Sequence, residues 1–280
     1  MYTNSLGGNY FQMYTHAFTF TKTRTGMLHN KTILITGGGS GIGEALALQL
    51  SSENKIIICG RNEEKLKRVA AKHQNISYEV ADLSRYESIE KLFATVKSKS
   101  IILDVLFNNA GVVELWDLNR DALSAKEIFE KANTNLSAPL AVTQYFINQA
   151  NKSKENLIVN NTSEIAILPV PVMPLYSASK TAFSVFTRLI RFQLEKTNFR
   201  VVELLTPGVD TDMPKQLNNS GKLMNVDDFA RDVIANIAMG TREYAPGKHI
   251  MLMRFFQRFA PSLGMRILDR MSKKQLGISK

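Results

Sequence analysis

A glycine-rich turn, set between a short apolar run and a helical pattern, constrains this 280-residue chain more than any other feature. Residues 31–36 (Lys-Thr-Ile-Leu-Ile-Thr) are β-branched and apolar and too few for a helix, which predicts a buried strand. The glycines of residues 37–43 follow at once, and residues 44–50 have the pattern of a helix. Strand, glycine turn and helix in this order indicate a dinucleotide-binding site, with a plain turn as the alternative.

Three glycines of this turn have expected roles. Gly37 would make the tight turn, Gly41 would let the backbone approach a pyrophosphate, and Gly43 would let the helix pack closely on the strand. The helix start would then offer free N–H groups and the positive end of its dipole to the phosphates.

The end of the second predicted strand, residues 55–59, indicates which dinucleotide binds. An NAD site normally places a carboxylate there to hold the ribose 2′-hydroxyl, whereas this chain has Gly60 followed by Arg61. A glycine cannot bind the hydroxyl, and an arginine can pair with a 2′-phosphate. The sequence therefore favours NADP(H), with NAD(H) as the alternative; Arg61 could also be a solvated residue at a helix start.

Three residues downstream suggest proton-transfer chemistry. Ser163 follows a predicted strand at 156–161, thirteen positions before Tyr176, and Lys180 lies four positions after Tyr176 on a predicted helix over 176–195. Residues four apart share a helix face. A nearby ammonium favours the phenolate and would bring the tyrosine pKa closer to the range useful for acid–base catalysis. Ser163 could hold a substrate oxygen against the phenol.

With these residues the chain resembles the short-chain dehydrogenase/reductase family over about residues 30–212, and the loop between Ser163 and Tyr176 is similar to that of DltE-like oxidoreductases. The resemblance implies a catalytic set of Asn135, Ser163, Tyr176 and Lys180. It implies, together with the reasoning above, a cofactor-binding set of Thr36, Gly37, Gly39, Ser40, Gly41, Ile42, Gly43, Arg61, Asp82, Leu83, Asn109, Ala110, Gly111, Tyr176, Lys180, Pro207, Gly208 and Thr211.

The resemblance also implies a mechanism. Hydride passes between the nicotinamide and a carbonyl carbon while Tyr176 protonates the carbonyl oxygen and Ser163 orients it. Lys180 lowers the pKa of the tyrosine and holds the nicotinamide ribose, and Asn135 fixes a water that links Lys180 to solvent. The expected partner is a moderately apolar carbonyl or alcohol, in a homodimer or homotetramer. A catalytically silent dinucleotide sensor and a membrane-surface interaction protein remain as alternatives.

Strand patterns at 31–36, 55–59, 76–80, 104–108, 156–161 and 199–205 alternate with helix patterns, and a seventh strand is expected near 249–253. This order predicts an α/β fold: a Rossmann-type, doubly wound parallel sheet of about seven strands with helices on both faces. We expect three regions: a disordered extension or misassigned start at 1–28, a catalytic domain at 29–250, and a basic amphipathic tail at 251–280.

Composition narrows the remaining choices. The single cysteine, Cys59, cannot form an internal disulfide, which fits a reducing compartment and a cytoplasmic protein. The four histidines lack the spacing of metal ligands, so no metal site is expected. Much of the +10 net charge lies in the tail, so the total charge is no argument for nucleic-acid binding. The tail either docks on the protein by its phenylalanines or lies on a membrane surface.

Overall fold

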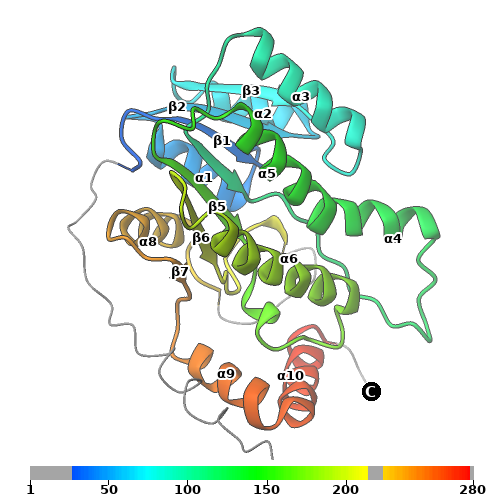
Figure 1. Cartoon of the computed structure of the whole chain (residues 1–280). Coiled ribbons are helices and arrows are strands. Elements are labelled where there is room, and N and C mark those ends of the chain that lie inside the picture. The colour runs from blue at the N-terminus through cyan, green and yellow to red at the C-terminus, as the bar shows by residue number, and fades with distance from the viewer. Residues whose placement is uncertain (1–26, 214–222, 278–280) are drawn as a thin grey trace, which may run out of the picture.

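A seven-stranded, wholly parallel sheet forms the centre of the computed structural model, which describes residues 27–213 and 223–277 (Figure 1). The strands run in the order β3-β2-β1-β4-β5-β6-β7. Their bounds are β1 Thr32–Thr36, β2 Lys55–Gly60, β3 Ile76–Val80, β4 Val105–Asn108, β5 Asn156–Asn161, β6 Phe199–Leu204 and β7 Glu243–Tyr244. The chain reverses direction across the sheet between β3 and β4, which places a crevice at the carboxyl ends of β1 and β4.

The central strands are apolar on both faces because helices cover both. Along β1, Ile33 and Ile35 enter one core layer and Leu34 enters the other. The first layer includes α1 (Gly41–Leu50), α2 (Glu63–Ala70) and α8 (Val226–Ala238). The second includes α3 (Tyr86–Ser98), α5 (Ala138–Gln149) and α6 (Pro174–Gln193). The predicted doubly wound α/β fold is confirmed.

Two short elements lie close to the catalytic residues. Helix α4 (Ala125–Ala132) continues through a π-helical turn, Asn133–Ser137, into α5. A 3₁₀ turn, Glu164–Ala166, follows Ser163 directly. Helix α6 begins at Pro174, two residues before its predicted start, and a proline is tolerated as the first residue of a helix because that position needs no N–H donor.

The prediction of a seventh strand near 249–253 is wrong. These residues begin α9 (His249–Phe259), which is followed by α10 (Pro261–Gln275), and β7 lies earlier in the chain. A short apolar run does not distinguish a strand from a buried helix segment. The inward side chains of Ile250, Met253 and Phe256 recur at helical spacing, and this longer pattern decides the structure.

Met27 and Leu28, the last two residues of the predicted extension, are buried in the first core layer. The rest of the predicted extension, residues 1–26, and residues 214–222 lie outside the described residues. Within the described ranges, the helices are all too short or too polar to cross a membrane.

Candidate active site

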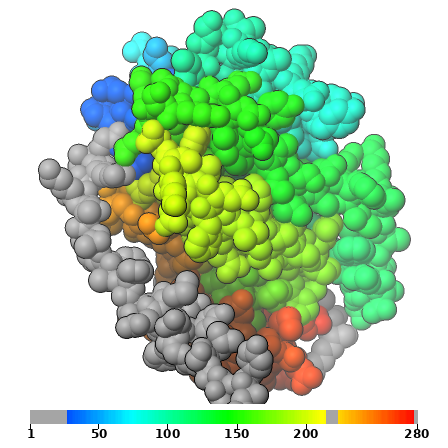
Figure 2. Space-filling model, in the orientation of Figure 1, coloured from blue at the N-terminus to red at the C-terminus, as the bar shows by residue number. Residues whose placement is uncertain are grey.

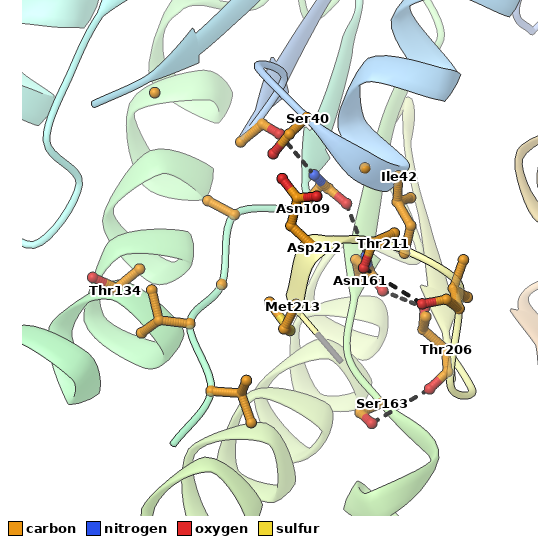
Figure 3. A pocket seen from close by; sticks show the side chains of 18 of the residues that line it. Ser40, Ile42, Asn109, Thr134, Asn161, Ser163, Thr206, Thr211, Asp212 and Met213 are labelled. Atoms are coloured by element: carbon orange, nitrogen blue, oxygen red, sulfur yellow. Dashed lines mark hydrogen bonds between the residues drawn. The ribbon is translucent and has the colours of Figure 1, made fainter. Parts of the chain in front are cut away.

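One cavity of about 440 Å³ opens at the carboxyl ends of the strands. It brings together residues that are up to 176 positions apart in the sequence, from Gly37 to Met213 (Figure 3). The predicted site residues that line it are Gly37, Gly39, Ser40, Gly41, Ile42, Arg61, Asp82, Leu83, Asn109, Ala110, Gly111, Ser163, Tyr176, Lys180, Pro207, Gly208 and Thr211. Thr36, Gly43 and Asn135 lie behind this lining.

The glycine turn has a backbone that side chains would disrupt. Gly37 and Gly41 have φ angles of +67° and +55°, in the left-handed region that favours glycine. Gly43 has an ordinary φ, but a Cβ there would lie 2.3 Å from the Gly37 carbonyl oxygen. The first turn of α1 therefore packs directly against the loop that precedes it.

The start of α1 fits a phosphate group. Its N-cap residue, Ser40, makes no side-chain capping hydrogen bond, so the first N–H groups of the helix remain available beside the cavity. Thr36 fixes the loop from behind: its Oγ accepts hydrogen bonds from the N–H groups of Asn109 (2.9 Å) and Ala110 (3.0 Å). A helix N-terminus with free donors and a dipole is a ready anion site.

Two cations, Arg61 and Lys65, and the carboxylate of Asp82 line the cavity. Arg61 is exposed, and Lys65 beside it forms an ion pair with Asp212 at 3.2 Å. Asp82 accepts hydrogen bonds from the N–H and hydroxyl of Ser84, which fix its carboxylate. Arg61 and Lys65 could meet a ribose phosphate, and Asp82 could meet an adenine.

A chain of polar side chains links the glycine loop to the catalytic end. The Asn109 amide donates to the Thr36 carbonyl at 2.9 Å, and the Asn161 amide donates to Asn109 Oδ1 at 2.9 Å. Thr206 Oγ donates to Asn161 Oδ1 (Figure 3). Lys180 Nζ donates to the Asn161 carbonyl at 2.8 Å. The strand ends are thus held in register by side chains as well as by the sheet.

Three predicted catalytic residues lie just after β5 and on α6. Ser163 lies just past β5, and its Oγ donates to the Thr206 carbonyl at 3.3 Å. Tyr176 and Lys180 share a face of α6, with Lys180 Nζ 5.7 Å from the tyrosine ring centroid. Lys180 is 3% exposed. All three line the same cavity as the glycine loop.

The expectation that Lys180 lowers the pKa of Tyr176 is not supported. Burial raises the pKa of Tyr176 to about 12; a hydrogen bond with Ser163 opposes this, and the carboxylates of Glu114 and Glu164 reinforce it. Burial also lowers the pKa of Lys180 to about 8, so the buried lysine holds its proton less tightly than a free lysine does. The physical reason is that both groups are desolvated together. Tyr176 is therefore a neutral phenol near neutral pH and a weaker acid than a free tyrosine.

Asn135 is buried in the π-helical turn and is fully engaged with the backbone. Its amide donates to the Val112 carbonyl at 2.8 Å, and its Oδ1 accepts from the Val112 N–H at 2.9 Å. A Cβ on Gly111 would lie 3.4 Å from Asn135 Oδ1 and 3.6 Å from Lys180 Nζ, so the three residues are neighbours. The water relay through Asn135 stays a prediction.

Sequence reasoning missed several residues of this region. Asn161 and Thr206 form the polar chain, and Lys65 joins Arg61. Glu114 is buried and accepts a hydrogen bond from the Tyr176 N–H at 2.9 Å. The contact of Glu164 with His249 Nε2, at 2.6 Å, was also missed. Asn161, the last residue of a predicted strand, was the one with a usable signal, because polar residues at carboxyl ends of parallel strands face ligand sites.

Comparisons with known proteins agree with this geometry. A family model described as short chain dehydrogenase matches residues 31–222. The uncharacterised oxidoreductase DltE of Bacillus subtilis is 35% identical over 186 residues, which cover 65% of this chain and 73% of that protein.

Solved structures share the fold. The 3-ketoacyl-(acyl-carrier-protein) reductase of Brucella melitensis, complexed with NADH, is 25% identical with a TM-score of 0.69, covering 78% of this chain and 96% of its own. A short-chain dehydrogenase of Burkholderia cenocepacia, in complex with NADP, is 22% identical with a TM-score of 0.73, covering 86% of this chain and 98% of its own.

Proposed function

The chain belongs to the short-chain dehydrogenase/reductase family, and on this premise we propose that it is an NADP(H)-dependent oxidoreductase that interconverts a carbonyl and an alcohol. The observation that carries the proposal is the convergence of Ser163, Tyr176 and Lys180 on the same cavity as the glycine turn. Because all three side chains are present, a silent sensor is the weaker reading.

The residues of the cavity fit a nicotinamide dinucleotide. The α1 N-terminus would hold the pyrophosphate, Asp82 and Leu83 the adenine, and Lys180 the nicotinamide ribose. Arg61 and Lys65 would hold the 2′-phosphate of NADP(H). Since one similar structure carries NADP and the other NADH, the preference for NADP(H) rests on Gly60 and Arg61 in this chain.

The bound nicotinamide supplies or accepts the hydride. Tyr176 moves the proton: its phenol donates from Oη to the substrate oxygen in reduction and its phenolate accepts in oxidation. Burial raises the pKa of Tyr176 to about 12, so the phenol, the form that carbonyl reduction needs, predominates near neutral pH. Ser163 Oγ donates to the same substrate oxygen and fixes it against the phenol.

The substrate end of the cavity is mainly apolar. Val113, Ile165, Met173 and Met213 line it, with Glu164 as its charged residue. This lining suits a moderately apolar carbonyl compound or alcohol. A homodimer or homotetramer and a cytoplasmic location remain predictions.

Equilibrium binding of NADPH and NADH to the purified chain tests the proposal. We expect NADPH to bind more tightly than NADH. Arg61→Ala should weaken NADPH binding by about 10- to 100-fold, because it removes one charge-assisted hydrogen bond. NADH binding should hardly change. Arg188→Ala, an exposed arginine on α6, is the matched control. Binding of neither nucleotide would refute the proposal, whereas a preference for NADH would overturn only the cofactor assignment.

Turnover completes the test. A panel of aldehydes and ketones is screened with NADPH by loss of absorbance at the nicotinamide band. Tyr176→Phe should lower turnover of any active compound by about 100- to 10,000-fold, the usual contribution of a general acid, with NADPH binding retained. Unchanged turnover in that variant would remove Tyr176 from the mechanism.

A further inference from the structure

The two C-terminal helices form a hairpin at one end of the molecule (Figures 1 and 2). We call residues 249–275, α9 and α10 together, the C-terminal hairpin. Its inner face packs on the domain: Ile250 and Met253 are buried with Ile167, Leu168 and Leu205, and Phe256, Met265 and Leu268 pack against them. The predicted docking of the tail is confirmed for this face, with Phe256 as the docking phenylalanine.

The outer face of α9 is apolar as well. Met251, Phe255 and Phe259 recur every four residues, and they are 79%, 54% and 71% exposed. Leu252 lies beside them and is 56% exposed. An apolar helix face is normally covered by other groups, whereas the described residues leave this face of α9 largely exposed.

The hairpin is also strongly basic. It contains six basic residues and one acidic residue, a net charge of +5. Arg254 pairs with Glu243, and Lys273 pairs with Asp269 at 2.8 Å. Arg258, Arg266 and Arg270 are exposed and have no carboxylate within ion-pair distance among the described residues. Arg258 lies four residues from Arg254, on the edge of the apolar stripe.

We propose that the C-terminal hairpin binds the surface of an anionic lipid bilayer, with the phenylalanines of α9 among the acyl chains and the arginines against the headgroups. Apolar side chains next to cations are the composition that an interfacial helix needs. The exposed arginines complement negative headgroups, each contributing about 1 kcal/mol near such a surface, a factor of about five in binding.

Charge argues against two other occupants of this face. A second copy of the chain would bring two hairpins of +5 together, and like charges across an interface oppose association. Residues 1–26 contain aromatic side chains but no aspartate or glutamate, so they supply no partner for the arginines. An anionic bilayer satisfies both the apolar stripe and the positive charge.

The hairpin is attached next to the candidate active site. His249, the first residue of α9, contacts the carboxylate of Glu164 at 2.6 Å, and Glu164 lines the cavity beside Ser163. A bilayer bound by the hairpin would thus lie against α9, whose first residue contacts Glu164, the residue that follows Ser163. The lipid-binding proposal does not depend on the proposed enzyme activity.

Vesicle flotation of the full-length protein tests the proposal. We expect it to float with vesicles of about 30% phosphatidylglycerol in phosphatidylcholine, and to bind pure phosphatidylcholine at least tenfold more weakly, because several arginines contribute. Phe255→Ser with Phe259→Ser should reduce binding at least tenfold. Arg258→Gln with Arg266→Gln and Arg270→Gln should reduce binding to anionic vesicles and remove most of its salt dependence.

A matched control distinguishes binding by the hairpin from nonspecific binding of exposed phenylalanines to vesicles. Phe129→Ser with Phe192→Ser changes two phenylalanines that are 68% and 77% exposed on α4 and α6, and it should leave flotation unchanged. Circular dichroism and thermal melting confirm that each variant is folded. No flotation of the wild-type chain, or equal loss in the control, would overturn the proposal. A dimer of the chain would also overturn the proposal, if sedimentation shows that Phe255→Ser with Phe259→Ser dissociates it and the wild-type chain does not bind vesicles.

Discussion

The carboxylate of Glu114 accepts a hydrogen bond from the backbone N–H of Tyr176 at 2.9 Å, and so caps the first turn of α6 from a distant part of the chain. Met173, the residue at the N-cap, makes no side-chain capping bond. Glu114 is buried, burial raises its pKa, and its second oxygen has no hydrogen-bond partner among the described residues. A buried carboxylate at this position acts as a positioning residue for the tyrosine.

Glu114→Ala should therefore cost about 1 kcal/mol of unfolding free energy, the usual worth of a helix cap. It should also lower turnover, because the start of α6 carries Tyr176. Glu114→Gln retains the acceptor and should recover most of both. Urea denaturation measures the first effect and steady-state kinetics the second. Equal losses in the alanine and glutamine variants would argue against capping as the role.

Glu114→Gln should also shift the pH profile. The carboxylate of Glu114 is one of the groups that raise the pKa of Tyr176, so its removal should lower that pKa. For carbonyl reduction, which needs the phenol, activity is retained below the tyrosine pKa and is lost as pH rises through it. The alkaline limb of kcat/KM should then move to lower pH in Glu114→Gln. A limb that stays in place would show that Glu114 has no electrostatic effect on Tyr176.

Lys180 should lower the free energy of unfolding at neutral pH, although the proposed reaction requires it. Burial lowers the pKa of Lys180 from its ordinary 10.5 to about 8, which at pH 7 corresponds to roughly 3 kcal/mol against the charged form. Lys180→Met removes this cost but leaves the Asn161 carbonyl without its lysine donor, a loss of about 1 kcal/mol. The variant should gain about 2 kcal/mol of unfolding free energy in urea at pH 7 and lose turnover.

The sign of the pH effect checks the cause. Between about pH 8 and 10.5 the unfolded chain binds more protons at Lys180 than the folded chain, so wild-type stability rises with pH there. The advantage of Lys180→Met should therefore shrink from pH 7 to pH 10. A constant difference between the two proteins would mean that packing, and not the buried charge, separates them.

Local sequence patterns predicted most of the sheet and much of the candidate site. The glycine turn, Ser163 and the spacing of Tyr176 and Lys180 are contiguous or periodic, and each predicts its own local geometry. Glu114 and the contact of Glu164 with His249 were missed because they join residues 62 and 85 positions apart. The pKa of Tyr176 was misjudged for a related reason: desolvation depends on the whole cavity, while sequence spacing shows only the nearby lysine.

Gly43→Ala should disrupt the glycine turn. Its Cβ would lie 2.3 Å from the Gly37 carbonyl oxygen and 2.9 Å from the Gly37 carbonyl carbon, so the loop must shift. Overpacking of this kind costs about 1–3 kcal/mol. We expect lower stability and weaker NADPH binding, measured by urea denaturation and nucleotide fluorescence. Gly60→Ala is the control, because its Cβ would make an ordinary 3.8 Å contact with Leu66 and should be tolerated.

Gly60→Asp should change the cofactor preference. The position has room for a side chain, since the nearest contact of a Cβ there is Leu66 Cδ2 at 3.8 Å and the backbone needs no positive φ. A carboxylate at the end of β2 can accept hydrogen bonds from the ribose 2′-hydroxyl of NADH and repels the 2′-phosphate of NADPH. The ratio of the NADPH and NADH dissociation constants should move toward NADH by at least about 100-fold, two charge-dependent interactions being exchanged. Gly60→Ala should leave the ratio unchanged, because it adds bulk without charge. If the alanine variant shifts the ratio as far as the aspartate does, the 2′-position of the ribose lies elsewhere in the cavity, and the assignment of Arg61 to the phosphate is lost with it.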